Sequence, residues 1–139
     1  MAPSFNNFGY VDRSSESSNS NILSFHSTAK WNAHFMALKE TNKLMVLDFT
    51  ATWCGPCKLM DSVIQDFAAK YTDVEFIKID VEELTEVSQA LQVQQLPTFV
   101  LVKKGKVADR VTGVPLRWAC PHLGPPAHSL VSQYRSRGL

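Results

Sequence analysis

Apolar and polar positions along the middle of the chain follow the periods of helices and strands. Behind Ser27, which suits a helix N-cap, apolar residues recur at helical spacing and predict a helix over about residues 28–40. Residues 44–50 are apolar without alternation, which is typical of a fully buried strand in a parallel sheet. The pattern therefore predicts a helix followed by a central strand.

The same analysis divides the chain as far as residue 112 into further elements. It predicts a helix ending near residue 70, a strand over 74–79, a helix over 84–91, and strands over 98–102 and 107–112 joined by a lysine-rich turn. The charges of the last strand suit an exposed sheet edge. Strand, helix, strand, helix and a hairpin together predict an α/β domain, in which helices cover both faces of a mixed sheet.

Two cysteines, Cys54 and Cys57, lie between the buried strand and the helix that follows it. A helix N-terminus offers unpaired N–H donors and a partial positive charge, which favour a thiolate over a thiol. Cys54 is therefore the expected nucleophile, and Cys57 is close enough to form a short disulfide ring with it. Pro56 suits the first helical turn and Gly55 leaves the approach to both sulfurs open, so we expect both to tune the redox pair. This arrangement indicates dithiol–disulfide exchange.

Two structural explanations of the cysteine pair carry less weight. A structural zinc site needs four ligands, and the remaining cysteine, Cys120, lies far along the chain among prolines, with His122 and His128 near it. A static disulfide closing so short a loop would remove little entropy from the unfolded chain.

Asp48 is the exception inside the apolar run of residues 44–50. A carboxylate in a buried strand is costly unless it has a partner or a function, and burial should raise its pKa. Two explanations stay open, namely a satisfied structural group and a proton acceptor for the cysteine pair.

Three segments resemble the thioredoxin family. Residues 48–58 read Asp-Phe-Thr-Ala-Thr-Trp-Cys-Gly-Pro-Cys-Lys and resemble its active-site segment, and residues 96–99 read Leu-Pro-Thr-Phe and resemble its cis-proline loop. Residues 24–27, Ser-Phe-His-Ser, together with Trp31 resemble the opening of plant cytosolic type-h thioredoxins with an N-terminal extension. The resemblance covers about residues 23–113 and implies the thioredoxin fold.

This resemblance implies a protein-disulfide reductase, in which Cys54 attacks a substrate disulfide and Cys57 resolves the mixed disulfide. Asp48 would accept the proton of Cys57, directly or through water. Lys78 would lie near Asp48 if it matches the family's buried lysine, and a solvated strand lysine is the alternative. A second hypothesis for the whole chain is a non-enzymatic binding or holdase module on a truncated thioredoxin fold.

The resemblance also implies a cis bond before Pro97, which would place the Leu96 backbone against Cys54. Trp53 and Gly113 would complete an apolar, largely uncharged surface that suits protein disulfides better than small molecules. No bound cofactor is implied, because electrons would come from NADPH through a thioredoxin reductase. The expected partners are that reductase and disulfide-containing target proteins.

Composition narrows the cellular setting. The chain has 139 residues, 45% of them hydrophobic, which suits one small domain with extra segments. Its net charge of +1 gives no electrostatic case for nucleic acid or an acidic membrane. No apolar run approaches the ~20 residues of a transmembrane helix, and neither a secretory signal nor a secreted disulfide framework is evident. We therefore expect a monomeric, cytoplasmic protein without a membrane anchor.

Residues 1–22, before the expected domain of residues 23–113, are rich in Ser and Asn and lack any period. Such a segment cannot bury enough apolar surface to offset its ordering entropy, so we expect a disordered extension. A transit peptide is the alternative. Ala2 stands where myristoylation requires Gly, so the extension is not expected to be acylated there.

Residues 114–139 depart from the family pattern. They contain four prolines and no acidic residue, where a thioredoxin should continue into a charged amphipathic helix. Only residues 128–137 could form a short helix, so the family's final helix is expected to be missing or replaced. An altered reading frame or a retained intron would explain this Pro-rich tail, and a functional basic tail with a free Cys120 is the alternative. We expect the tail to pack loosely or not at all and the domain to lose stability.

Overall fold

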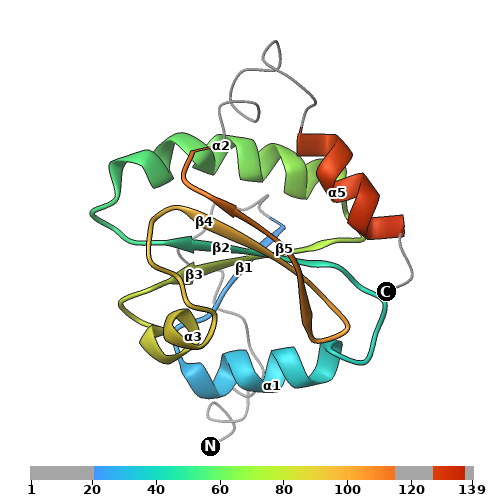
Figure 1. Cartoon of the computed structure of the whole chain (residues 1–139), viewed down its shortest axis with the longest axis horizontal. Helices are drawn as coiled ribbons and strands as arrows, with labels where there is room; N and C mark the ends of the chain where they lie inside the picture. The colour runs from blue at the N-terminus through green and yellow to red at the C-terminus, as the bar shows by residue number, and fades with distance from the viewer. Residues whose placement is uncertain (1–20, 115–126, 137–139) are drawn as a thin grey trace, which may run out of the picture.

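The structure of the chain, a computed structural model, describes residues 21–114 and 127–136. Its elements follow in the order β1 (Ile22–Ser24), α1 (Thr28–Leu38), β2 (Met45–Thr50), α2 (Gly55–Lys70), β3 (Glu75–Asp80), α3 (Thr85–Ala90), β4 (Thr98–Lys103), β5 (Lys106–Thr112) and α5 (Ala127–Ser136). Figure 1 shows α2 and α5 on one face of the sheet and α1 and α3 on the other. The predicted α/β architecture, with helices on both faces of a mixed sheet, is confirmed.

The described strands form one mixed sheet in the order β1-β3-β2-β4-β5. Strands β1 and β2 run parallel to β3 on either side of it, whereas β4 is antiparallel to β2 and β5 is antiparallel to β4. Every residue of β2 and β4 is buried, because helices cover both faces at the centre of the sheet. The charged strand β5 lies at the edge, as its sequence predicts.

Local sequence explains where several elements begin and end. Ser27 caps α1 by accepting a hydrogen bond from the backbone N–H of Lys30 at 3.1 Å, as predicted. Lys104 and Gly105 join β4 to β5, and their φ angles of 53° and 76° suit a two-residue hairpin turn. A Cβ at position 105 would lie 3.3 Å from the Cβ of Lys39, so glycine also lets the hairpin approach α1.

The sheet separates two hydrophobic clusters. The cluster beneath α2 and α5 includes Met60, Ile64, Phe67, Phe76, Phe99 and Val131. The cluster beneath α1 and α3 includes Trp31, Phe49, Ile77, Leu84, Val87 and Val100. Because both clusters contain side chains from the central strands, burial on the two faces holds these strands in place from both sides.

The C-terminal helix α5 packs on the sheet, so the expectation of a loosely packed tail is wrong for this helix. Val131 is 1% exposed and belongs to the cluster beneath α2. The Nε of Arg135 lies 2.9 Å from the Oδ2 of Asp73, and the ammonium of Lys103 donates hydrogen bonds to the carbonyls of Tyr134 and Arg135. The sequence pattern misled because polar contacts from other elements help to hold the helix. The family's final helix is replaced rather than missing.

The domain starts with β1, a strand that the sequence analysis did not predict. Ile22, which was placed in the extension, is 7% exposed and pairs with Phe76 of β3. A strand of three residues is too short to show an alternating pattern. Residues 1–20 of the expected extension and Cys120 of the tail lie outside the described residues. None of the described helices is long and apolar enough to cross a membrane.

Candidate active site

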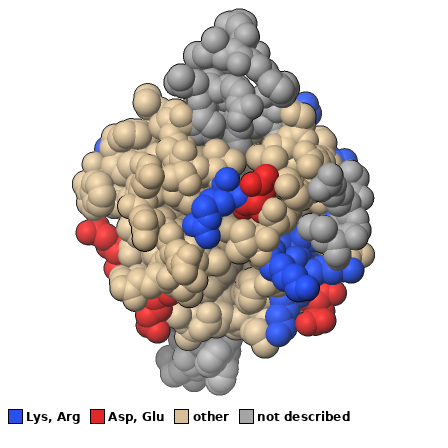
Figure 2. Space-filling model, viewed as in Figure 1, with Lys and Arg blue, Asp and Glu red and all other residues tan. Residues whose placement is uncertain are grey.

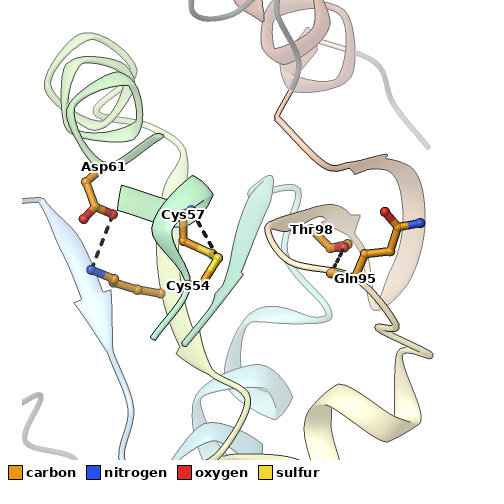
Figure 3. The surroundings of a disulfide bond; sticks show 6 residues. Cys54, Cys57, Asp61, Gln95 and Thr98 are labelled. Carbon is orange, nitrogen blue, oxygen red and sulfur yellow. Dashed lines mark hydrogen bonds and ion pairs between the residues drawn. A yellow bond between two sulfur atoms is a disulfide. The ribbon is translucent and has the colours of Figure 1, made fainter. Parts of the chain in front are cut away.

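The two cysteines lie where β2 delivers the chain to the start of α2. Cys54 is the N-cap residue of α2, and Cys57 lies in its first turn. The two form a disulfide with a Cα–Cα distance of 5.4 Å, which Figure 3 shows beside Asp61. Both residues are only 3% exposed. Exposure therefore does not distinguish the two thiols. The difference between them lies in their hydrogen bonds to the backbone.

The backbone N–H of Cys57 points at the sulfur of Cys54 with an N–Sγ distance of 3.2 Å. A donor aimed at a sulfur stabilises its thiolate more than its thiol, and the positive end of α2 acts in the same direction. Cys54 receives both effects because it caps the helix. The structure therefore favours the thiolate at Cys54.

Gly55 and Pro56 occupy the first turn of α2. The missing N–H of Pro56 removes no helical hydrogen bond there, because the first N–H groups of a helix have no partner within it. A Cβ at Gly55 would meet no atom within 4 Å. Glycine at this position is thus not required by packing, and the space beside the disulfide is open.

Asp48 lies in the middle of β2 and is 5% exposed. Its register partners are Lys78 on β3 and Phe99 on β4. Burial raises the pKa of Asp48 from 3.8 to about 7, while the Lys78 ammonium lowers this pKa and the Asp61 carboxylate raises it. A carboxyl group with a pKa near neutrality can both accept and release a proton under physiological conditions.

Lys78 combines features of the two predictions that the sequence left open. It lies opposite Asp48 in the sheet, as the resemblance implied. Its side chain is nevertheless 35% exposed, and its Nζ lies 3.6 Å from the Oδ1 of Asp61 on α2. Lys78 therefore reaches the solvent while its charge still acts on the buried carboxyl.

A groove of about 470 Å³ runs beside the disulfide. Its lining consists of Trp53, Cys54, Gly55 and Pro56 together with Val81, Val93, Gln94 and Leu96. Trp53 is 67% exposed, which is unusual for so large an apolar side chain. Among the described residues that line the groove, none carries a permanent charge. The groove beside Cys54 is therefore free of permanent charge along its described lining.

The loop before β4 forms one wall of this groove. The Leu96–Pro97 peptide bond is cis, as the resemblance implied, and Leu96 packs against the buried cysteine pair. The hydroxyl of Thr98 donates a hydrogen bond to the carbonyl of Gln95 at 2.6 Å, which Figure 3 shows. The backbone N–H of Gly113 donates to the Pro97 carbonyl at 2.8 Å. Hydrogen bonds on both sides thus hold Pro97 in position.

Gly113 is the site residue at which backbone geometry requires glycine. Its φ angle is +81°, in the left-handed region that side chains disfavour. The next residue, Val114, packs against the hydrophobic cluster beneath α2. Gly113 therefore lets the chain leave β5 beside Pro97 and return to the core.

A basic hollow lies away from the groove. Lys39, Lys103, Lys104 and Lys106 line a separate hollow near the β4–β5 turn. Figure 2 shows basic side chains gathered at that end of the molecule, whereas α2 begins at the opposite end of the sheet in Figure 1. The basic hollow is therefore separate from the uncharged groove, and Lys58 and Asp61 of α2 line another, charged cavity.

Sequence reasoning missed several residues at this site. Val93 and Gln94 line the groove, but nothing in their local pattern indicates a wall. Asp61 pairs with Lys78 across two elements. Its position one helical turn after Cys57 was the available signal, because residues at that spacing lie on one face of a helix.

Within the described part of the chain, no group of three or more His, Cys, Asp or Glu side chains could hold a metal ion.

Comparison with known proteins agrees with this geometry. The family model described as thioredoxin matches residues 24–117. The chain belongs to the thioredoxin family. It is therefore a thiol–disulfide oxidoreductase, and its redox pair is the disulfide between Cys54 and Cys57.

Among its relatives, this thioredoxin is 49% identical over 98 residues to thioredoxin H2 of Arabidopsis thaliana, covering 70% of this chain and 74% of that protein. It is 46% identical over 98 residues to thioredoxin H2-1 of Oryza sativa subsp. japonica, covering 70% and 71%. The crystal structure of thioredoxin NaTrxh from Nicotiana alata superposes with a TM-score of 0.76 at 46% identity, covering 88% of this chain and 99% of that one. These similarities confirm the resemblance to plant type-h thioredoxins.

Proposed function

We propose that this thioredoxin is a cytoplasmic, monomeric reductant of protein disulfides, which thioredoxin reductase regenerates with electrons from NADPH. The observation that carries the proposal is a dithiol pair at a helix N-terminus beside an apolar groove that lacks permanent charge. The similarity to plant type-h thioredoxins supports the cytoplasm and the reductase partner.

The first step is attack by the Cys54 thiolate on one sulfur of a substrate disulfide. A bond forms between Cys54 and that sulfur, the substrate S–S bond breaks, and the second substrate sulfur leaves as a thiolate. The hydrogen bond from the Cys57 N–H and the N-terminus of α2 support the thiolate at Cys54. Gly55 and Pro56 set the shape of this turn, and we expect them to tune the redox potential.

The second step is attack by Cys57 on the Cys54 sulfur of the mixed disulfide. Cys57 first gives its proton to Asp48, directly or through water, and then forms the Cys54–Cys57 bond while the substrate sulfur leaves as a thiolate. Two electrons pass in total from the dithiol to the substrate disulfide. The raised pKa of Asp48, about 7, suits this role because it lies close to working pH.

Substrate binding is assigned to Trp53, Leu96, Pro97 and Gly113. Trp53 and Leu96 both line the groove. Leu96 packs against the cysteine pair, and the hydrogen bond from the Gly113 N–H to the Pro97 carbonyl supports the adjoining loop. An extended substrate segment could pair with this backbone in the manner of an added strand, which explains how one groove accepts many sequences.

Reduction of insulin disulfides by the full chain, with dithiothreitol as the electron source, tests the proposed function. We expect turnover by the natural chain and none by the Cys54→Ser variant, while Cys57→Ser should accumulate the mixed disulfide. Replacing dithiothreitol with NADPH and a plant thioredoxin reductase tests the proposed electron donor. A chain that keeps unfolded insulin soluble without reducing it would instead be the holdase module.

A further inference from the structure

Asp61 lies beside the cysteine pair and has no role in the steps assigned above. It is on α2, one helical turn after Cys57, and Figure 3 draws its side chain in the surroundings of the disulfide, with a dashed line to its ion-pair partner. Its Oδ1 lies 3.6 Å from the Nζ of Lys78 on β3. Lys78 is also the register partner of Asp48 on β2. The Lys78 ammonium therefore forms an ion pair with one carboxylate and acts through its charge on a second carboxylate from another element.

The two carboxylates differ in their access to solvent. The Asp61 side chain is 39% exposed and the Lys78 side chain is 35% exposed, whereas Asp48 is 5% exposed. Asp61 and Lys78 line a cavity of about 340 Å³. Asp61 and Lys78 are thus accessible to solvent, whereas Asp48, whose ionisation they influence, is buried.

The charged and titratable groups around this cavity come from two elements and two connecting segments. Those on the cavity wall are Lys58 and Asp61 from α2, Lys78 and Asp80 from β3, Glu83 from the segment after β3, and His26 from the segment after β1. Cys57 lies on the same helix as Asp61. Of these groups, Lys78 and Asp61 act on Asp48 most directly, because the Lys78 charge lowers its pKa and the Asp61 charge raises it.

Among the described residues, the ion pair of Lys78 is with Asp61, at 3.6 Å, and none joins Lys78 to Asp48. An ammonium drawn toward Asp61 stabilises the ionised form of Asp48 less, so Asp48 keeps its proton to a higher pH. We propose that Asp61 is a positioning residue of the redox site, which draws Lys78 away from Asp48 and thereby strengthens Asp48 as the acceptor of the Cys57 proton. This inference rests on the proposed role of Asp48 as that acceptor.

The direct test is an NMR titration of the Asp48 carboxyl carbon in the reduced full chain, assigned with the Asp48→Asn variant. In Asp61→Asn, Lys78 loses its outer partner and becomes available to Asp48. We expect the Asp48 titration midpoint to fall by about half a pH unit or more. A midpoint that stays where it is in the natural chain overturns the proposal, and it does so without any measurement of reductase activity.

A second background separates the Lys78 route from the charge of Asp61 itself. In Lys78→Met, the Asp48 midpoint should rise, because the lysine charge is gone. Adding Asp61→Asn to Lys78→Met should then shift the midpoint by less than half of its effect in the natural chain. An equal shift in both backgrounds would show that Asp61 acts on Asp48 without Lys78, which contradicts the proposal.

Asp66→Asn is the matched control, because Asp66 is an exposed acid on the same helix and its loss changes the net charge equally. Asp66→Asn should leave the Asp48 titration midpoint unchanged. Asp61→Glu keeps the negative charge, so its Asp48 midpoint should lie close to that of the natural chain. Urea unfolding of each variant checks that the fold is kept.

The pH profile of insulin reduction by each variant should shift in the same direction as the Asp48 titration midpoint measured by NMR. A profile that does not move with the midpoint overturns the proton-acceptor role of Asp48 and, with it, the catalytic part of the inference.

Discussion

The ammonium of Lys103 on β4 donates a hydrogen bond to the backbone carbonyl of Tyr134 in α5 at 2.9 Å. A second hydrogen bond reaches the carbonyl of Arg135 at 3.1 Å. The last carbonyls of a helix have no partner within it, and a positive charge near them is favourable. Lys103 is 3% exposed, so this cation is withdrawn from water, and it donates two of its hydrogen bonds to α5.

Replacing Lys103 with Met should destabilise the protein. The side chain keeps its apolar stem, but two helix-end carbonyls lose a charged donor. The expected loss of unfolding free energy is about 1–3 kcal/mol. Urea unfolding measures it, and Lys104→Met serves as the control, because Lys104 is an exposed neighbour in the turn. Equal stability of the two variants would show that Lys103 does not hold α5.

The apolar contact of α5 can be tested separately. Val131 is 1% exposed in the cluster beneath α2, so Val131→Ala should remove about 1–3 kcal/mol of unfolding free energy. Gln133→Ala on the exposed side of the same helix is the matched control and should change little. A Val131→Ala protein as stable as this control would mean that α5 does not contribute to the core in solution.

The packing of α5 marks the limit of what the sequence could predict. Residues 128–137 were predicted as a possible helix because their local composition permits one. Whether that helix would dock depended on Lys103, whose own pattern indicated only a strand ending in a lysine-rich turn. The contact joins segments far apart in the sequence, so no local period reveals it.

The redox site shows the same division. Cys54, Cys57 and the buried strand beneath them were predictable, because a helix start after an apolar run is a local signal. The loop before Pro97 was predictable only through resemblance to the family. The pairing of Asp61 with Lys78 brings α2 and β3 together. Each of the two residues alone looks like an ordinary surface charge.

The two redox thiols should differ in reactivity. In the reduced protein, the Cys57 N–H and the helix N-terminus stabilise the thiolate at Cys54. Limiting alkylation at neutral pH should therefore modify Cys54 before Cys57, and peptide mapping identifies the labelled residue. The Cys54→Ser variant is the control and should react much more slowly. Preferential labelling of Cys57 or Cys120 would contradict the assignment of the nucleophile.

The raised pKa of Asp48 also predicts how stability depends on pH. The folded value of about 7 lies above the unfolded value of 3.8, so the folded state holds a proton that the unfolded state has lost between these limits. The contribution of Asp48 is therefore favourable below the unfolded value, and it is lost as pH rises through the folded value. The full effect is on the order of 4 kcal/mol.

Asp48→Asn should remove this dependence, because an amide does not ionise. Urea unfolding at about pH 5 and about pH 8 should show that the variant gains stability over the natural chain at the higher pH, where the buried carboxylate is charged. Insulin reduction by the same variant should be slower at neutral pH, because Cys57 loses its proton acceptor. The two readouts separate the possible roles of Asp48. A gain in stability without slower turnover would mean that the buried acid is only structural. If turnover is slower but the pH dependence of stability is the same in Asp48→Asn and the natural chain, Asp48 is already ionised in the folded chain. Its surroundings would then have to stabilise the buried carboxylate.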